Sequence, residues 1–295
     1  MLNPYEDPSA RADRGVAAPD DEELAAYANR VRELVVQMCA NPEGGHLGGS
    51  MSLVEILVTL YFSVLRVDPA HPDDPDRDIF ILSKGHGALA QYATLAVRGF
   101  ISESSLAGYG GPDSMLTAHP NPAVPGVEMP TGSLGHGLAL GVGFAMDLAM
   151  SGSDRRCFVV LGDGELQEGS VWESAMSASA QGLDRLVAVV DRNGLQITGT
   201  TEDTLSLEPL ADRWRSFGWS VIEVDGHDLA QLRSALAGAP SEPGRPTVVL
   251  ANTVKGRGLP YVEGQVRSHY AKLSGRQRQR ALATLASEYV RENQS

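Results

Sequence analysis

The chain has 295 residues, 42% of them hydrophobic and 6% aromatic, which is enough to bury the core of one large domain or of two ordinary ones. Its formal net charge of −13 at pH 7 argues against binding to nucleic acid or to an anionic membrane. The same charge would repel phosphorylated ligands unless positive charge is supplied locally, for example by a bound metal ion.

The ends of the chain and its cysteines limit where the protein can work. Residues 1–20 carry prolines and charges where a secretory signal would be apolar, so we expect a flexible arm. The longest apolar stretch, 137–150, is too short to span a bilayer and contains Asp147, so we expect no membrane segment. Cys39 and Cys157 are too few for a disulfide framework or a zinc site, which favours a reducing cytoplasm.

The first predicted element in the chain is a helix over residues 22–40. Its apolar residues recur at helical spacing, and Asp20 with Glu23 resembles an N-capping pair. A glycine-rich link and a second helix over 52–65 should follow. A turn-rich segment then leads to a strand over 79–83.

Later in the chain, apolar β-branched runs alternate with helical patterns. The runs cover residues 157–164, 185–193, 220–226 and 246–254. Three helical patterns lie between them: one extends to Gln181, one surrounds Arg213 and one surrounds Leu232. A further, charged helix is expected from Ser274 onward. This alternation predicts an α/β fold, a doubly wound and mostly parallel sheet with helices on both faces, in one domain over 21–295. Its binding site is expected in the crevice at the carboxyl ends of the strands.

Two polar residues follow predicted strands in a way that indicates a metal site. Asp163 and Asn193 are thirty positions apart, the span of one strand–helix–strand unit, so neighbouring parallel strands would bring them together. A carboxylate, an amide oxygen and a backbone carbonyl from the turn after Asn193 would form half of an oxygen shell, leaving positions for water and phosphate. The pattern therefore predicts a Mg²⁺-diphosphate site, with Gly162 and Gly164 letting the backbone approach the diphosphate.

Two other interpretations of these glycines are weaker. Gly-Asp-Gly alone is also typical of an ordinary turn after a strand. A dinucleotide-binding turn would need a further glycine or alanine at a fixed spacing. Gln167 stands at that spacing after Gly-Asp-Gly, and Met146 after the Gly-Val-Gly of 141–143, so neither turn is complete.

Gly-Asp-Gly followed about thirty residues later by asparagine resembles the signature of thiamine diphosphate-binding proteins. The other motifs resemble one branch of these proteins, the transketolases, from about residue 20 to residue 272. The matching segments are NPEGGHLGGSMS (41–52), DRDIFILSKGHGALA (76–90), AHP (118–120), TGSLGHGLALGVGFA (131–145), LGDGELQEGSVWE (161–173) and VVDRNGLQITG (189–199). Their order along the chain is that of the family, which makes the resemblance specific.

The resemblance to transketolases implies a role for each matching residue. Mg²⁺ would be held by Asp163, Asn193 and the backbone carbonyl of Leu195. The reacting carbons and hydroxyls of the sugar would be surrounded by His46, His86 and His119, with His269 near both diphosphate and substrate. The contacts with thiamine diphosphate would come from His86, Gly132, Ser133, Leu134, Gly162, Asp163, Gly164, Glu165, Asn193 and His269. Glu168 would belong to a carboxylate network that crosses a dimer interface between two cofactors.

Several residues depart from the family pattern or fall outside it. His136 stands where the family usually has glutamine, which changes the contacts around the thiazolium ring. The residues that flank His269 match the family poorly. Glu168 is expected on the first turn of a helix, where the helix dipole alone could stabilise its charge. His71 and His227 match no motif, and the sequence assigns them no function.

The resemblance also implies that part of the catalytic apparatus lies on another polypeptide. In the family, a glutamate on a second domain binds the aminopyrimidine ring of the cofactor, and that domain carries most of the basic residues for the sugar phosphate. This sequence ends at Ser295, about where that domain would begin. We therefore expect one subunit of a split transketolase, which works with a separate pyrimidine-binding subunit in an α₂β₂ assembly on a ketose phosphate donor. The glycine- and alanine-rich residues 129–150 and the helix after Gly169 would pack across the interface, although the same pattern fits an ordinary buried helix.

Two alternatives remain open at this point. The α subunit of a 2-oxo acid dehydrogenase E1 component shares the Gly-Asp-Gly to asparagine signature and the split architecture, but does not need His46, His86 and His119 in their loops. A cofactor-binding relative without catalysis is the other, and the intact Asp163, Asn193 and histidines argue against it.

Overall fold

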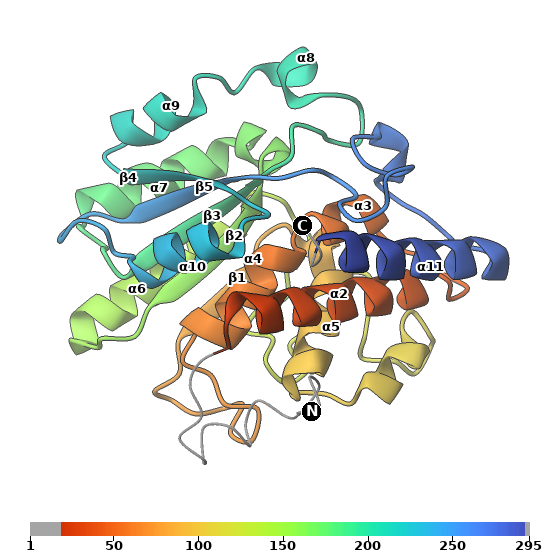
Figure 1. The fold of residues 1–295 in the computed structure, drawn as a ribbon. Helices are drawn as coiled ribbons and strands as arrows, with labels where there is room; N and C mark the ends of the chain where they lie inside the picture. Colours follow the sequence, from red (N-terminus) through yellow and green to blue (C-terminus); the bar gives the residue numbers. More distant parts are fainter. Residues whose placement is uncertain (1–18, 293–295) are drawn as a thin grey trace.

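A computed structural model describes residues 19–292, in which a central sheet is flanked by helices (Figure 1). The predicted N-terminal arm lies, up to residue 18, outside the described residues. The strands are β1 (Ile79–Leu82), β2 (Cys157–Gly162), β3 (Leu186–Arg192), β4 (Ser220–Asp225) and β5 (Thr247–Asn252). The α-helices are α2 (Asp21–Met38), α3 (Leu47–Met51), α4 (Val54–Thr59), α5 (Ala88–Arg98), α6 (Gly137–Ser151), α7 (Gly169–Ala180), α8 (Thr201–Leu205), α9 (Leu210–Ser216), α10 (Leu229–Ala237) and α11 (Gly275–Glu292). Within the described residues, no helix is long and apolar enough to cross a bilayer.

The sheet confirms the predicted α/β class. Its five strands are all parallel and lie in the order β1-β2-β3-β5-β4. Each strand falls within one of the apolar runs identified in the sequence. Because every neighbouring pair is parallel, the carboxyl ends of all five strands lie along one edge.

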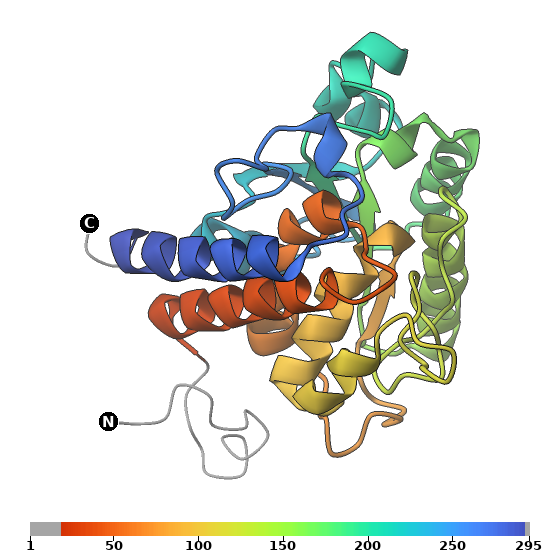
Figure 2. The ribbon, with the colours of Figure 1, turned by 90° about the vertical axis from the view of Figure 1, so that its right-hand side faces the viewer.

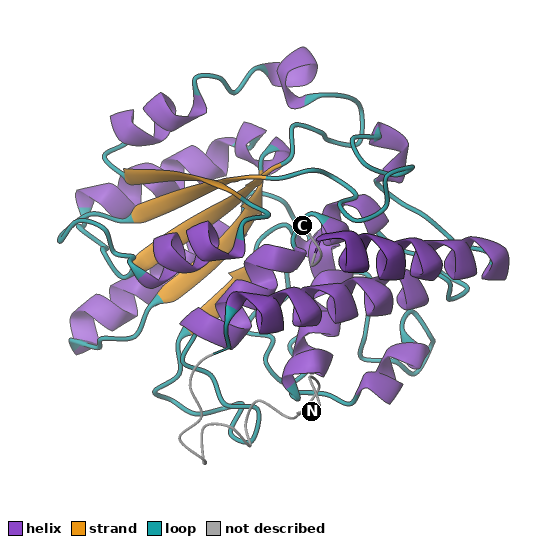
Figure 3. Ribbon diagram, viewed as in Figure 1, coloured by secondary structure: helices purple, strands orange, loops and turns teal. Residues whose placement is uncertain are grey.

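Alternate residues of each strand feed two separate cores. In β2, Phe158 and Val160 belong to one core, whereas Val159 and Leu161 belong to the other. The first core is covered by α2, α4, α5, α10 and α11, and the second by α6, α7 and α9 (Figures 2 and 3). Strands buried on both faces explain why their sequences are continuously apolar rather than alternating.

Helix α2 begins where its capping residues predict. The Asp20 side chain accepts the backbone N–H of Glu23 at 2.9 Å, and the Glu23 carboxylate accepts the backbone N–H of Asp20 at 3.3 Å. This reciprocal pair satisfies two of the donors that a helix N-terminus leaves unpaired. The helix then runs beside α11, which comes from the other end of the chain (Figures 1 and 2).

The prediction of a glycine-rich link and one helix over 52–65 is wrong in detail. Residues 47–51 form the helix α3, and 52–65 contains the short helix α4 followed by a π-helical turn, Leu60–Val64. All five residues of α3 are buried, so packing against neighbouring elements outweighs the low helix propensity of its two glycines. The helix places His46, its N-terminal flanking residue, beside the carboxyl edge of the sheet.

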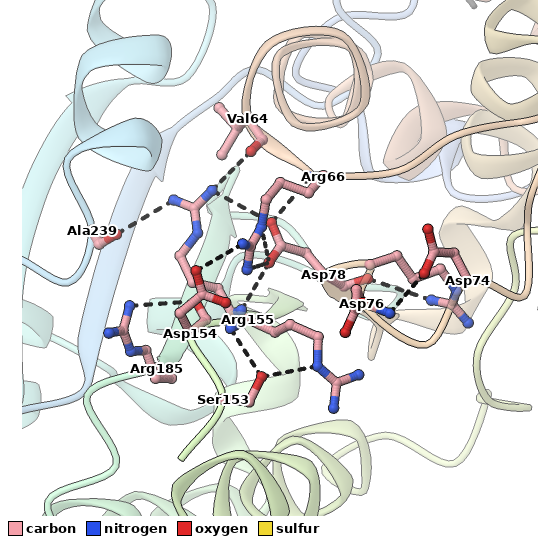
Figure 4. A network of polar contacts seen from close by, with 12 residues as sticks. Val64, Arg66, Asp74, Asp76, Asp78, Ser153, Asp154, Arg155, Arg185 and Ala239 are labelled. Atoms are coloured by element: carbon pink, nitrogen blue, oxygen red, sulfur yellow. Dashed lines mark hydrogen bonds and ion pairs between the residues drawn. The ribbon is translucent and has the colours of Figure 1, made fainter. Parts of the chain in front are cut away.

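A polar network fastens the opposite, amino end of the sheet. Asp78, fully buried just before β1, accepts the backbone N–H groups of Arg66 at 3.0 Å and Arg156 at 2.8 Å, and also both guanidinium groups (Figure 4). Arg156 further donates to the carbonyl of Val64 at 2.8 Å. The contacts join the amino ends of β1 and β2 to the chain that leaves the π-helical turn.

Candidate active site

A cavity of about 380 Å³ opens at the carboxyl ends of β1, β2, β3 and β5, where the sequence predicts the site. Twelve of the predicted site residues line it: His86, His119, Gly132, Leu134, Gly162, Asp163, Gly164, Glu165, Glu168, Asn193, Leu195 and His269. Ser133 is exposed and is not part of this lining. His46 does not line the cavity but packs against the histidines that do.

Adjacent strands bring Asp163 and Asn193 together, as the sequence predicts. They directly follow β2 and β3, which pair in parallel. The Asp163 carboxylate accepts the N–H of Gly164 at 2.8 Å and the N–H of Gly194. Asn193 Oδ1 accepts the N–H of Leu195 at 3.2 Å, so the turn after β3 folds around the aspartate. Burial, reinforced by the charge of nearby Asp191, raises the pKa of Asp163 to about 6.

These oxygens fit a small divalent cation. Carboxylate, amide and backbone carbonyl oxygens are the hard donors that Mg²⁺ prefers, and a cation would relieve the repulsion between Asp163 and Asp191. Gln196 Oε1, on a residue that lines the same cavity, is buried without a hydrogen-bond partner. The described residues contain no group of three or more His, Cys, Asp or Glu side chains placed to hold a metal. A cation at Asp163 and Asn193 would therefore take its remaining ligands from other oxygens, such as amides, backbone carbonyls, water or a phosphate.

A buried ion pair lies beneath the metal motif. Lys84 and Asp191 are 1% and 0% exposed and bind each other directly, and Lys84 also donates to the carbonyl of Gly49 at 3.1 Å. The Asp191 carboxylate also accepts the hydroxyl of Ser52 at 2.7 Å. The charge and hydrogen bond from Lys84 outweigh the effect of burial and hold the pKa of Asp191 below its usual value. Sequence reasoning missed both residues, although each lies within two positions of a predicted site residue.

Lys255 is a second lysine that the sequence analysis missed. It follows β5, and its Nζ donates to the carbonyl of Leu195 at 3.0 Å and to Nδ1 of His269 at 3.3 Å. Burial, with the charge of Lys84, lowers its pKa to about 8. In the described part of the chain, Lys255 has no carboxylate within ion-pair distance, so its charge is available to the cavity, unlike that of Lys84. The available signal was a lysine between a predicted strand and two glycines, in the segment 254–258.

The four predicted histidines form one cluster. The ring centroid of His46 lies 5.7 Å from that of His86, 5.9 Å from His119 and 5.3 Å from His269. His86 and His269 are 5.4 Å apart. His46 Nδ1 is buried without a hydrogen-bond partner, which is expected of a group that binds a ligand.

The cluster favours neutral imidazoles. Burial, followed by the charges of neighbouring histidine and lysine groups, lowers the pKa of both His46 and His269 to about 4, and that of His86 well below its usual value. At neutral pH the rings of His46, His86 and His269 therefore each have one donor and one acceptor nitrogen, so they can hold or move a proton at a ligand hydroxyl.

These depressed pKa values predict a loss of stability in mild acid. Between about pH 6.5 and pH 4 the unfolded chain binds protons at His46 and His269 but the folded chain does not, so the stability present above 6.5 falls on acidification. After allowance for solvent at these half-buried sites we expect about 1 kcal/mol per histidine. Urea unfolding at pH 7.5 and pH 5 would measure it, and the difference should shrink in His46→Gln and His269→Gln. The exposed His71 serves as control, and an equal reduction in His71→Gln would contradict the assignment.

The glycine-rich segment before α6 forms one wall of the cavity. Gly132 has φ +138°, and a Cβ there would meet the His119 ring at 3.0 Å, so glycine is needed for this close approach. Thr131 donates its hydroxyl to the carbonyl of Leu82 at 2.7 Å, which fixes the segment to the end of β1. The Glu165 carboxylate accepts the N–H of Gly135 at 2.9 Å and further bonds from Gly162 and Ser83. Glu165 thus holds the wall in place with its carboxylate.

Glu168 lies in a different element from the predicted one, and His136 lies on the surface. Glu168 was predicted on the first turn of a helix, but it is extended and α7 begins at Gly169, because Gly164–Gln167 first forms a 3-10 turn. Its side chain makes no capping hydrogen bond and lines the cavity instead. His136 is exposed, and its Nδ1 lies 3.2 Å from the carbonyl of Leu134.

Comparisons with known proteins identify the family of the chain. The family model "Transketolase, thiamine diphosphate binding domain" matches residues 24–287. An apulose-4-phosphate transketolase subunit from Actinobacillus succinogenes is 44% identical over 90% of this chain and 97% of its own length. The 6-deoxy-6-sulfo-D-fructose transketolase subunit of Clostridium sp. is 40% identical over 90% of this chain and 97% of its own.

Solved structures give the same result for the fold. The transketolase from Leishmania mexicana superposes with a TM-score of 0.83 at 30% identity, over 90% of this chain and 41% of that one. The chain thus spans almost the full length of the two subunits and about two fifths of the solved transketolase. With a family model matched over most of its length and relatives at 40–44% identity, the chain belongs to the transketolase family and corresponds to its thiamine diphosphate-binding domain.

Proposed function

We propose that the chain is the diphosphate-binding subunit of a two-component transketolase that uses thiamine diphosphate and Mg²⁺ to transfer a two-carbon ketol unit from a ketose to an aldehyde acceptor. The observation that carries this proposal is the cavity in which the oxygens of Asp163 and Asn193 face a cluster of histidines, with His86, His119 and His269 in its lining and His46 packed against them. Oxygen ligands suit the metal and diphosphate, and the histidines suit the hydroxyls of a sugar.

The metal–diphosphate end of the cofactor would be held at the ends of β2 and β3. Asp163, Asn193 and the carbonyl of Leu195 would coordinate Mg²⁺, while Gly162 and Gly164 let the diphosphate approach the backbone. Lys255 now donates to the carbonyl of Leu195 and would turn its charge to the diphosphate when the metal takes that oxygen. This local positive charge would offset the repulsion between the diphosphate and a protein of net charge −13.

The histidines would act on the sugar. Thiamine diphosphate, when bound, supplies the carbanion chemistry that ketol transfer needs. His46 and His86 would bind the ketose oxygens and hold or accept their protons, which their neutral state permits at pH 7. His119 and His269 would orient the substrate from the two sides of the cluster, and Gly132, Ser133 and Leu134 would lie along the thiazolium.

A second polypeptide would complete the site. Helices α6 and α7 pack against each other and leave the apolar side chains of Met146, Met150 and Met176 exposed by 37%, 86% and 52%, which a partner subunit would bury. Both subunit relatives match this chain over 97% of their own lengths. We place a pyrimidine-binding subunit on this surface, in an α₂β₂ assembly, with Glu168 in a carboxylate network at the interface.

The donor is proposed as a class. The two relatives are named for apulose 4-phosphate and 6-deoxy-6-sulfo-D-fructose, ketoses with an anionic group remote from the carbonyl. We propose a donor of that kind, such as a ketose phosphate. Cys39 and Cys157 are buried and unpaired, which supports work in a reducing cytoplasm.

Titration and turnover test the proposed function directly. Thiamine diphosphate should bind to the chain in the presence of Mg²⁺ and not in EDTA, as measured by calorimetry. With the partner subunit, ketol transfer from ketose phosphates to aldoses should follow. A chain that binds no thiamine diphosphate under either condition would refute the proposal.

Substitution of the histidines separates binding from chemistry. His46→Ala and His86→Ala should each lower kcat by about 10²- to 10⁴-fold, the usual effect of losing a positioned acid or base. Thiamine diphosphate affinity should stay near wild type in His46→Ala and fall far less than kcat in His86→Ala, because neither ring is among the proposed metal ligands. The exposed His71, which matches no family motif, provides a matched control, His71→Ala, with little loss. A His86→Ala variant that loses cofactor but retains turnover when saturated with it would limit the role of His86 to cofactor binding.

A further inference from the structure

The segment that follows β5, residues 253–257, makes hydrogen bonds on two sides. Toward the cavity, the Thr253 hydroxyl donates to Asp191 and the Lys255 ammonium donates to the carbonyl of Leu195. Away from the cavity, the backbone N–H of Val254 and the backbone carbonyl of Arg257 are held by side chains from other elements. The position of Lys255 thus depends on contacts made behind it.

Those contacts come from a buried triad of Arg32, Glu55 and His227, on α2, α4 and the β4–α10 turn. Glu55 is bound by Arg32 and lies 3.0 Å from His227 Nδ1. The Val254 N–H donates to His227 Nε2 at 2.8 Å. The side chains of the three triad residues are 8–10% exposed. Because Nε2 must accept, the proton of the imidazole is on Nδ1, where it is donated to Glu55.

The carboxylate of the triad is ionised under all physiological conditions. Burial opposes its ionisation, but the charge of Arg32 and the contact with His227 outweigh it and hold the pKa of Glu55 at about 2. A charged Glu55 favours the Nδ1–H form of His227 and so keeps the other nitrogen free to accept. Arg32 completes the link by donating from Nε to the Arg257 carbonyl at 3.3 Å.

The backbone of the β4–α10 turn is also packed tightly on the segment after β5. Gly226 donates its N–H to the carbonyl of Asn252 at 2.8 Å, and a Cβ on Gly226 would meet the Thr253 side chain at 2.4 Å. The turn that carries His227 therefore cannot shift without moving the residues that flank Lys255.

We propose that His227, held in one tautomer by Glu55 and Arg32, is a positioning residue that places Lys255 in the active site through the backbone of Val254. The proposal rests on the proposed function for the role of Lys255, and on the geometry alone for the link to Val254. Buried ion pairs seldom stabilise a fold more than well-packed apolar residues of similar volume do. Stability alone therefore does not explain why these three residues are charged or polar. Two side chains of the triad, those of Arg32 and His227, instead bind the backbone of one segment, and Glu55 joins them to each other.

Two amide substitutions test the two hydrogen bonds of the His227 ring separately. His227→Gln puts an amide near the Nε2 position and can still accept the Val254 N–H, whereas His227→Asn puts it near Nδ1 and can still donate to Glu55. Hydrogen exchange at the Val254 amide can be measured by NMR in the chain alone. It should accelerate by about tenfold in His227→Asn, which loses the hydrogen bond to Val254, and change little in His227→Gln, which keeps it. The ¹⁵N shifts of His227 in the wild type should show a protonated Nδ1, and Glu55→Gln should weaken that preference.

A neighbouring residue separates positioning from stability. Asp228 caps α10 by accepting the N–H of Gln231 at 2.9 Å, and lies in the same turn without touching the triad. Asp228→Ala should lower thermal stability yet leave exchange at Val254 and ketol transfer unchanged. In the assembled enzyme, kcat should fall by about tenfold to a hundredfold in His227→Asn, the cost of a small misplacement, and recover in His227→Gln.

Each outcome decides the inference. Equal Val254 exchange in the Asn and Gln variants, or faster exchange in Asp228→Ala, would overturn the link between His227 and the segment. Normal kcat in His227→Asn despite faster exchange would overturn the role of that link in placing Lys255. Failure of the wild-type chain to bind thiamine diphosphate would refute the proposed function but leave the exchange test intact.

Discussion

Replacing Asp163 is expected to abolish retention of thiamine diphosphate. The carboxylate is the single charged group among the three proposed metal ligands, and without Mg²⁺ the diphosphate would face a protein of net charge −13. Substitution of residues that merely support a metal ligand costs about 10- to 100-fold in affinity, so loss of the ligand itself should exceed a hundredfold. Calorimetric titration of thiamine diphosphate at fixed Mg²⁺ measures it in Asp163→Ala and in the nearly isosteric Asp163→Asn.

The controls separate loss of binding from loss of fold. Relief of the repulsion between Asp163 and Asp191 offsets the lost backbone contacts, so Asp163→Asn should melt close to the wild-type temperature. Asp212→Ala removes one exposed negative charge on α9 that is not part of the cavity lining, and should leave affinity unchanged. Unchanged thiamine diphosphate affinity in Asp163→Asn would remove this residue from the metal site.

The second large effect is dependence on a second polypeptide. We expect the purified chain, given Mg²⁺, thiamine diphosphate and a ketose phosphate, to show no ketol transfer and slow hydrogen–deuterium exchange at the thiazolium C2. Adding the partner should raise both by at least about 10²-fold, because the proposed partner would supply the activating carboxylate. Turnover or fast exchange by the chain alone would show that it carries its own activating group, and the two-component proposal would fail.

The surface of α6 offers a variant that tests where the partner binds. Gly143 is exposed, and nothing lies within 4 Å of a Cβ built there, so Gly143→Glu should fold normally in the isolated chain. The added side chain and charge should block close packing and prevent both complex formation and turnover. Gly275→Glu, equally open at the start of α11, should assemble as wild type. Normal assembly of Gly143→Glu would place the partner elsewhere.

The sequence was most informative where one local pattern determines the structure. Continuous apolar runs located all five strands, and the spacing of Asp163 and Asn193 predicted that adjacent strands would bring them together. The capping box at Asp20 located the start of α2 to within one residue. These features depend on residues close in sequence or on the fixed geometry of parallel strands.

Features that depend on partners distant in sequence were not predictable. Lys84 and Asp191 are 107 positions apart, and each alone is an ordinary charged residue. The helix at 47–51 forms because tertiary packing outweighs the preference of its glycines. His227 matched no motif, because its role arises from contacts with Glu55, 172 positions away, and with Val254, 27 away.

The network around Asp78 stabilises the fold at one edge of the sheet, whereas the loops that line the cavity lie at the other edge and can vary in sequence. It fastens the sheet at the edge opposite the cavity, so changes in the loops at the carboxyl edge leave its hydrogen bonds untouched. New sugars could then be accommodated by loop substitutions whose cost in folding stability is small, since loops tolerate change better than the elements they connect. A library that randomises Gln196 and Ile197, which line the cavity in the turn after β3, while preserving Asp78 and its two arginines should yield mostly folded proteins. Altered donor preference should arise among them far more often than from a library of the same size directed at the strands.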